Sequence, residues 1–188
     1  MRDSRSILRF ASLLALSALL GACASPRRAE RPDPPTLMEW EDFDPATTDQ
    51  VWLAGQPSEA ALDRSASESA GRGGLVVNLR TDGEMAYLPY YGRSVAARGV
   101  RYVRIPTSGS TLSAETAEAF GDAVRGHDGP VLLHCASGGR ATYLWAMVRM
   151  ENEGLSADEA IAWAESRREN PWERGAEILR EFGGEPVE

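Results

Sequence analysis

Short apolar segments and longer stretches of helical spacing alternate along most of the chain. The apolar segments, bounded by turn residues, predict buried strands, and the stretches between them predict helices. The predicted strands cover residues 50–54, 75–79, 100–105 and 131–134. The predicted helices cover residues 59–70, 84–98, 114–125, 140–150, 156–168 and 171–182. Strands separated by helices indicate an α/β fold, with a mainly parallel central sheet of about four to five strands flanked by helices.

Polar and turn residues indicate where several helices begin. Ser58 and Ser113 are residue types favoured at the N-cap, and Ser156-Ala-Asp-Glu159 has the spacing of a capping box. Pro89 interrupts the stretch 84–98, and Pro171 is a residue type favoured at a helix start. We therefore expect helices to begin next to both serines, after Ser156 and at Pro171.

The first residues have the pattern of an export signal. Three arginines precede the apolar run Phe10–Leu20, which is too short to span a membrane and suits the apolar region of a signal peptide. The run ends in Leu20-Gly-Ala-Cys23, which resembles the lipobox of bacterial lipoproteins. The resemblance implies that residues 1–22 are a lipoprotein signal peptide and that Cys23 carries several acyl chains, which give a stable membrane anchor. The alternative is an ordinary secretory signal in which the cysteine is a coincidence.

The segment after the signal predicts how the rest of the chain is attached. Residues 23–39 are rich in proline and charge, which predicts a flexible tether, and residues 40–188 form the folded domain. Ala24 after the cysteine favours the outer membrane in the sorting pattern of such lipoproteins. We expect a protein of the bacterial cell envelope, lipid-anchored at the outer membrane and facing the periplasm.

Composition excludes several kinds of chemistry. The chain has 188 residues and a formal net charge of −8, and it contains no basic block, which argues against nucleic acid as a partner. Two cysteines and two histidines are too few for a disulfide framework or a zinc site of the Cys/His type. Every basic residue is arginine, so Schiff-base chemistry on lysine is excluded. We expect neither a metal nor an organic cofactor.

The segment Val131–Arg140 carries the candidate chemistry. A buried strand ends at His134-Cys135, a loop of small residues follows, and a helix begins at the far end of the loop. Ligands of open α/β sheets bind beyond the carboxyl ends of the strands. Gly138 and Gly139 permit turns that point N–H groups inward, the helix N-terminus adds positive potential, and Arg140 offers a planar fork.

This loop combines a nucleophile with an anion site. The predicted phosphate-binding residues are Ala136, Ser137, Gly138, Gly139 and Arg140. Cys135 lies at the base of this electropositive cup, where the thiolate form is favoured. The alternative is a buried, inert cysteine, but such a residue needs no anion site. His134 is predicted to orient the loop by hydrogen bonding, with proton transfer as the alternative.

The motif resembles the signature loop of cysteine-dependent protein phosphatases, in which His-Cys opens the loop and an arginine closes it. The resemblance implies that Cys135 attacks phosphorus and that Arg140 and the loop amides stabilise the charge of the transition state. The usual phosphatase loop has one residue more between cysteine and arginine than the segment Ala136–Gly139 provides. Rhodanese-type sulfurtransferases share the shorter spacing, so the loop alone leaves phosphoryl and sulfur transfer open.

Further segments favour a phosphatase. In chain order they are Gly55-Gln-Pro-Ser58, Val76-Val-Asn-Leu-Arg80 with Asp82-Gly-Glu84, Tyr102-Val-Arg-Ile-Pro106 and His134-Cys-Ala-Ser-Gly138. Together they resemble a bacterial family of dual-specificity-like tyrosine phosphatases related to the phosphatase-like domain of beta-lactamase-hydrolase-like proteins. The resemblance covers roughly residues 50–165. The loop of that family reads close to His-Cys-Ala-Ser-Gly-Asn-Arg, so this chain departs from it at Gly139.

A phosphatase also needs an acid that protonates the leaving oxygen. Many relatives carry an aspartate on the loop after the strand equivalent to 100–105, but residues 106–113 contain no carboxylate here. The nearest substitute follows the neighbouring strand, and we predict Asp82 as the catalytic acid in preference to Glu84. The alternative is a solvated loop in which Glu84 begins a helix. Arg80 either adds positive charge near the site or pairs with a carboxylate.

The sequence thus predicts that residues 40–188 are a phosphatase-like catalytic domain. It hydrolyses phosphotyrosine-like phosphomonoesters through a thiophosphate on Cys135, and its substrate is a phosphorylated protein or a small phosphomonoester. One alternative is sulfur transfer through a Cys135 persulfide. The other, motivated by the missing acid, is a non-catalytic module that binds phosphate or phosphopeptides.

Overall fold

A five-stranded sheet lies at the centre of the part of the chain that the computed structural model describes, residues 40–41, 51–69 and 73–184. All of these residues belong to one compact unit, Asp33–Glu188. The predicted signal peptide, the predicted tether and Cys23 lie outside the described residues. The hypotheses of a signal peptide and a lipid anchor therefore stay predictions.

The sheet has the strand order β1-β2-β5-β3-β4. The strands are β1 (Trp40–Glu41), β2 (Val51–Ala54), β3 (Leu75–Asn78), β4 (Arg101–Arg104) and β5 (Val131–His134). β1 runs antiparallel to β2, and the other neighbouring strands run parallel. His134 pairs with Ala54 on one side and with Asn78 on the other, so β2, β5 and β3 end in register. The segments that follow these strands therefore leave the sheet at the same edge.

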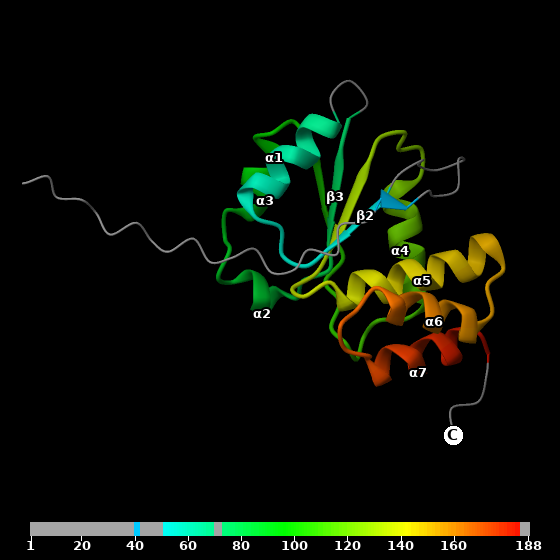
Figure 1. Cartoon of the computed structure of the whole chain (residues 1–188). Coiled ribbons are helices and arrows are strands. Elements are labelled where there is room, and N and C mark those ends of the chain that lie inside the picture. The colour runs from blue at the N-terminus through cyan, green and yellow to red at the C-terminus, as the bar shows by residue number, and fades with distance from the viewer. Residues whose placement is uncertain (1–39, 42–50, 70–72, 185–188) are drawn as a thin grey trace, which may run out of the picture. The chain divides into compact units, whose positions relative to one another are not determined.

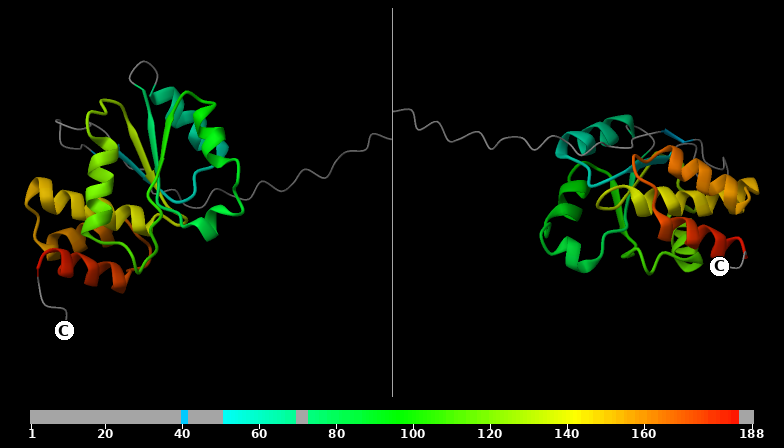
Figure 2. Two further views of the ribbon diagram at one scale, coloured as in Figure 1. Left: turned by 180° about the vertical axis from the view of Figure 1, so that it is seen from behind. Right: turned by 60° about the horizontal axis from the view of Figure 1, so that its bottom comes forward.

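Helices cover both faces of the sheet. They are α1 (Glu59–Glu68), α2 (Asp82–Met85), α3 (Tyr91–Ala96), α4 (Ala114–Val124), α5 (Gly139–Glu153), α6 (Ala157–Ser166) and α7 (Glu173–Phe182). Figures 1 and 2 show α1 and α3 on one face and α4, α5, α6 and α7 on the other. Among the helices of the described residues, none is long and apolar enough to cross a membrane.

Successive residues of the central strands point to opposite faces and form two cores. Val77 of β3 belongs to the larger core, which contains Phe120 of α4 and Trp145 of α5. Val76, its neighbour, belongs to the smaller core with Leu62 of α1. β2, β3 and β5 are buried along their whole length, as expected for parallel strands covered by helices on both faces.

The predicted α/β class is confirmed, and the differences are local. The predicted helix 84–98 is divided into α2 and α3, because Pro89 lacks the amide that a continuous helix needs there. The last helix begins at Glu173 rather than at Pro171, because Trp172 keeps an extended backbone with ψ of 92°. The two-residue strand β1 was not among the predicted strands, because a run that short has no readable period.

Candidate active site

The loop between β5 and α5 curls around the sulfur of Cys135. The cysteine is fully buried, and the N–H of Gly138 donates a hydrogen bond to its Sγ at 3.2 Å. Gly138 has a φ of 88°, in the left-handed region that favours glycine, and this turn brings its N–H to the sulfur. α5 begins at the next residue, so the positive end of the helix points at the loop. The predicted nucleophile and the predicted anion site are therefore brought together.

The backbone of this loop is attached to the end of β2. The N–H of Cys135 donates to the carbonyl of Ala54 at 3.2 Å, and the N–H of Gln56 donates to the carbonyl of Ala136 at 3.0 Å. Gly55 lies between these two contacts, and a Cβ there would stand 3.2 Å from the Ala136 oxygen. A side chain at this position would push the loop away. The Gly-Gln-Pro segment noted in the sequence thus has a direct structural role.

His134 is held at both ring nitrogens. Its Nδ1 lies 3.2 Å from the carbonyl oxygen of Cys135, and its Nε2 lies 3.0 Å from the hydroxyl of Tyr91. A carbonyl oxygen only accepts, so Nδ1 carries the hydrogen and Nε2 accepts from Tyr91. Complete burial lowers the pKa of His134 to about 3, so the imidazole is neutral at pH 7. These contacts favour the loop-orienting role over proton transfer.

Glu84 forms a bidentate ion pair with Arg140, in which both carboxylate oxygens accept hydrogen bonds from the guanidinium. The Nη2–Oε1 distance is 2.7 Å and the Nη1–Oε2 distance is 2.9 Å. Thr81 in turn holds Glu84, because its N–H donates to Oε2 at 2.8 Å in a capping box at the start of α2. The hydrogen bonds from Arg140 lower the pKa of Glu84 to about 2. Glu84 is therefore an anion that positions Arg140, and it carries no proton to donate at neutral pH.

Asp82, the predicted acid, lies on the same short helix but away from Arg140. Its side chain is 85 % exposed, and its Oδ1 is 2.7 Å from Nη2 of Arg104. Such an exposed ion pair contributes little free energy and breaks readily. The structure brings Glu84 rather than Asp82 onto Arg140, and the role of Asp82 as the acid stays a prediction.

Arg80 connects two of the segments around the loop. Its Nη1 donates to Oε1 of Gln56 at 2.6 Å, and its Nη2 donates to the backbone carbonyl of Glu84 at 3.0 Å. Both partners are uncharged groups, and among the described residues no carboxylate forms an ion pair with Arg80. Of the two alternatives for Arg80, the structure favours added positive charge near the site.

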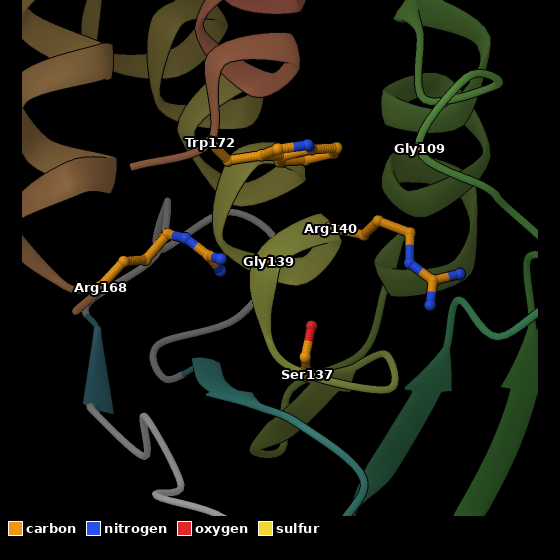
Figure 3. Close-up of a pocket in the computed structure, with 6 residues that line it drawn as sticks. All are labelled: Gly109, Ser137, Gly139, Arg140, Arg168 and Trp172. Atoms are coloured by element: carbon orange, nitrogen blue, oxygen red, sulfur yellow. The ribbon is translucent and has the colours of Figure 1, made fainter. Parts of the chain in front are cut away.

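A cavity of about 230 Å³ opens beside the loop. Its lining residues, shown in Figure 3, are Gly109, Ser137, Gly139, Arg140, Arg168 and Trp172. Arg168 and Trp172 lie between α6 and α7, outside every motif that the sequence shows. Their signal in the sequence is indirect: Gly139 departs from the resembled loop, and a Cβ there would stand 2.8 Å from Nη1 of Arg168.

In the described ranges, no cluster of His, Cys, Asp and Glu side chains is placed to hold a metal ion.

Comparison with known proteins gives relatives of one kind. The family model described as "Beta-lactamase hydrolase-like protein, phosphatase-like domain" matches residues 46–151. The beta-lactamase hydrolase-like protein of Xylella fastidiosa (strain 9a5c) is 33% identical over 90 residues, which are 46% of this chain and 21% of the relative. That of Agrobacterium fabrum is 32% identical over 102 residues, which are 53% of this chain and 23% of the relative. The matches thus span less than a quarter of the length of these relatives.

Solved structures of phosphatases share the fold. Tk-PTP in its active form has a TM-score of 0.54 and 30% identity, over 71% of this chain and 91% of that one. TpbA of P. aeruginosa has a TM-score of 0.55 and 20% identity, over 85% of this chain and 94% of that one. Another TpbA structure contains pTyr, with a TM-score of 0.53 and 18% identity over 77% of this chain and 91% of that one. At these identities the likeness to TpbA concerns the fold alone.

The buried neutral imidazole predicts how stability depends on pH. Because the pKa of His134 is depressed in the folded state, the unfolded chain takes up a proton that the folded chain does not, and stability falls as pH drops from about 6.5 towards 3. In a His134→Asn variant, the loss of unfolding free energy between pH 7 and pH 5 should be smaller by about 2 kcal/mol. Urea unfolding at both pH values measures this difference. Equal losses in the two proteins would contradict it.

Proposed function

The chain belongs to the family described as beta-lactamase hydrolase-like protein, phosphatase-like domain, and on this premise we propose that it is a cysteine-dependent phosphatase. Its proposed substrates are phosphotyrosine-like phosphomonoesters, carried by a protein or by a small molecule. The observation that carries the proposal is the loop that holds Sγ of Cys135 against the N–H of Gly138, with Arg140 at its far end lining the cavity beside the loop.

The proposed reaction has two displacements at phosphorus. In the first, the Cys135 thiolate attacks, the S–P bond forms, and the bond from phosphorus to the leaving oxygen breaks as that oxygen takes a proton from the acid. In the second, water attacks phosphorus and gives its proton to the conjugate base of the acid. The S–P bond breaks, which releases inorganic phosphate and restores the thiolate. This sequence of steps needs no metal or organic cofactor.

Two groups stabilise the charge that develops on the phosphoryl oxygens. In the proposed complex the N–H groups of residues 136–140 donate to the anion, as that of Gly138 does to Sγ of Cys135 here, and Arg140 adds a guanidinium whose orientation is set before substrate arrives. Glu84 supplies that orientation, since it holds both Nη atoms of Arg140. We assign proton donation to Asp82, because Glu84 is committed to Arg140 and Asp82 is released by breaking one exposed ion pair.

The nucleophile is tested with two reactions of the purified protein. Wild type should release phosphate from p-nitrophenyl phosphate, and Cys135→Ser should lose this activity by a factor of about 10³ or more, because the hydroxyl is a far weaker nucleophile than the thiolate. Both proteins are also incubated with thiosulfate and cyanide. Phosphate release that survives in Cys135→Ser would contradict the assignment, and thiocyanate formation without phosphate release would favour sulfur transfer.

The two carboxylates are separated by varying the leaving group. Asp82→Asn should lower kcat/KM about 10²-fold or more for phenyl phosphate, whose phenolate needs a proton, but only slightly for p-nitrophenyl phosphate. Glu84→Gln should lower kcat/KM about tenfold or more for both substrates, because it loosens Arg140. An Asp82→Asn effect that is the same for both leaving groups would remove Asp82 from the role of acid.

We also propose that Cys23 is lipidated and holds the protein at the outer membrane, facing the periplasm. The support is the sequence Leu20-Gly-Ala-Cys23 after an apolar run. In cell fractionation the full chain should be found with the membranes, and a Cys23→Ser variant should be found in the soluble or unprocessed fraction. A wild-type chain that is recovered without lipid would overturn this proposal.

A further inference from the structure

Arg168 brings a second guanidinium to the cavity beside the catalytic loop. Its Nε donates to the backbone carbonyl of Asn170 at 3.2 Å, and within the described residues its Nη groups have no hydrogen-bond or ion-pair partner. Nη1 lies where the side chain of residue 139 would stand, since a Cβ on Gly139 would be 2.8 Å away. The guanidinium therefore rests against the first residue of α5, in space left by the missing side chain.

This position is electrostatically unfavourable for a cation. The N-terminus of α5 carries a partial positive charge, and Arg140 adds a full one at the next residue. Glu84 compensates Arg140, whereas none of the described residues that line the cavity is acidic. An arginine held against a helix N-terminus without a carboxylate is stabilised when an anion binds between the positive groups.

The anion that Arg168 would bind is distinct from the one in the loop. Figure 3 shows the side chains of Arg168 and Arg140 on opposite sides of Gly139, with the hydroxyl of Ser137 below and the indole of Trp172 above. The indole is held by its neighbours: it packs edge-on against Tyr143, with ring centroids 5.1 Å apart. The indole of Trp172 therefore closes one side of the cavity, and the side chains of Arg168 and Arg140 lie on two other sides.

The size of the cavity limits what can occupy it. Its volume of about 230 Å³ is below the ~300–1,000 Å³ typical of pockets for drug-sized ligands, so a small charged group fits it better than a large apolar one. A group bound there lies next to the phosphate held by the loop. Both charges must then belong to one compact part of the substrate.

We propose that Arg168 is a specificity residue that binds a second anionic group of the substrate, a phosphate or a carboxylate close to the phosphate that is hydrolysed. The proposal rests on the proposed phosphatase function. Its consequence is a preference for phosphomonoesters that carry a second anionic group, such as bisphosphates or phosphorylated groups flanked by a carboxylate, over phosphomonoesters without one. Gly139 is part of this proposed anion site because a side chain there would displace the guanidinium of Arg168.

The test compares substrates that differ in the second anionic group. Phenyl phosphate has only its phosphate, 3-carboxyphenyl phosphate adds a carboxylate, and benzene-1,3-diyl bisphosphate adds a second phosphate. Arg168→Gln should lower kcat/KM about tenfold for one or both of the substrates with a second anionic group, mainly by raising KM. For phenyl phosphate it should change kcat/KM by less than about twofold. Arg168→Lys should restore part of the loss. The matched control is Arg167→Gln, whose guanidinium stacks on Trp163 at 4.2 Å and does not line the cavity.

The outcomes separate this inference from the proposed function. An Arg168→Gln effect on the bisphosphate alone identifies the second group as phosphate, and an effect on the carboxylate alone identifies it as an acid. An equal fall for all substrates, or no fall for any, overturns the inference while wild-type turnover leaves the phosphatase proposal standing.

If the wild-type protein shows no turnover, the phosphatase proposal is wrong. The inference about Arg168 is then tested by measuring the binding of phosphate ligands. Calorimetry with inorganic phosphate and with benzene-1,3-diyl bisphosphate on Cys135→Ser should show a preference for the bisphosphate that disappears in Cys135→Ser/Arg168→Gln. The same preference in both proteins would overturn the second site.

A further variant tests the role of the glycine. Gly139→Ala should reproduce the loss on the substrates with a second anionic group and add little in the Arg168→Gln background, because both changes remove the same contact. Additive losses would show that Gly139 acts on the loop itself and not through Arg168, which would contradict its place in the proposed anion site.

Discussion

The site depends on a close approach between two stretches of backbone, the end of β2 and the loop after β5. Gly55 and Gly138 face each other there, and a Cβ on Gly138 would stand 3.5 Å from the Gly55 nitrogen. The approach lets the N–H of Cys135 and the carbonyl of Ala136 continue the pairing of the sheet beyond its strands. It thereby holds Sγ of Cys135 under the N–H of Gly138, and the reaction proposed for this protein starts from that arrangement.

Charge around the loop is distributed so that each arginine has a separate function. Arg140 is held by Glu84, which sets its direction and leaves its charge partly compensated. Arg80 joins the Gly-Gln-Pro segment to the start of α2 through uncharged partners. Arg168 stays without a carboxylate in the described structure and faces the cavity. A chain with a net charge of −8 thus builds a local positive site, which net charge alone would not suggest.

Local pattern was sufficient for the fold and for the centre of the site. The apolar runs that became β2, β3 and β5, and the turn residues after β5, act within a few positions, so the α/β class and the loop 135–140 could be predicted. The partner of His134 could not, because Tyr91 is 43 residues away and reaches it only across the smaller core. Arg168 and Trp172 reach the loop through the packing of α6 and α7, and the only trace of this near the motif is Gly139, whose meaning becomes clear once Arg168 is placed.

The carboxylates show the same limit at shorter range. The sequence places Asp82 and Glu84 after the strand next to the loop, but which of the two faces Arg140 depends on the turn of α2 and on the capping box of Thr81. The capping geometry directs Glu84 inward and leaves Asp82 exposed. A position can therefore be predicted from strand order, while the direction of a side chain needs the local hydrogen bonds.

The central claim is that Cys135 forms a covalent bond to phosphorus during turnover. The most direct measurement is mass spectrometry of the protein denatured within milliseconds of mixing with p-nitrophenyl phosphate. The account predicts one phosphoryl group per chain, located on the peptide that contains Cys135 and lost as turnover ends. Phosphate release with no phosphorylated cysteine, or with the phosphoryl group on another residue, would contradict it.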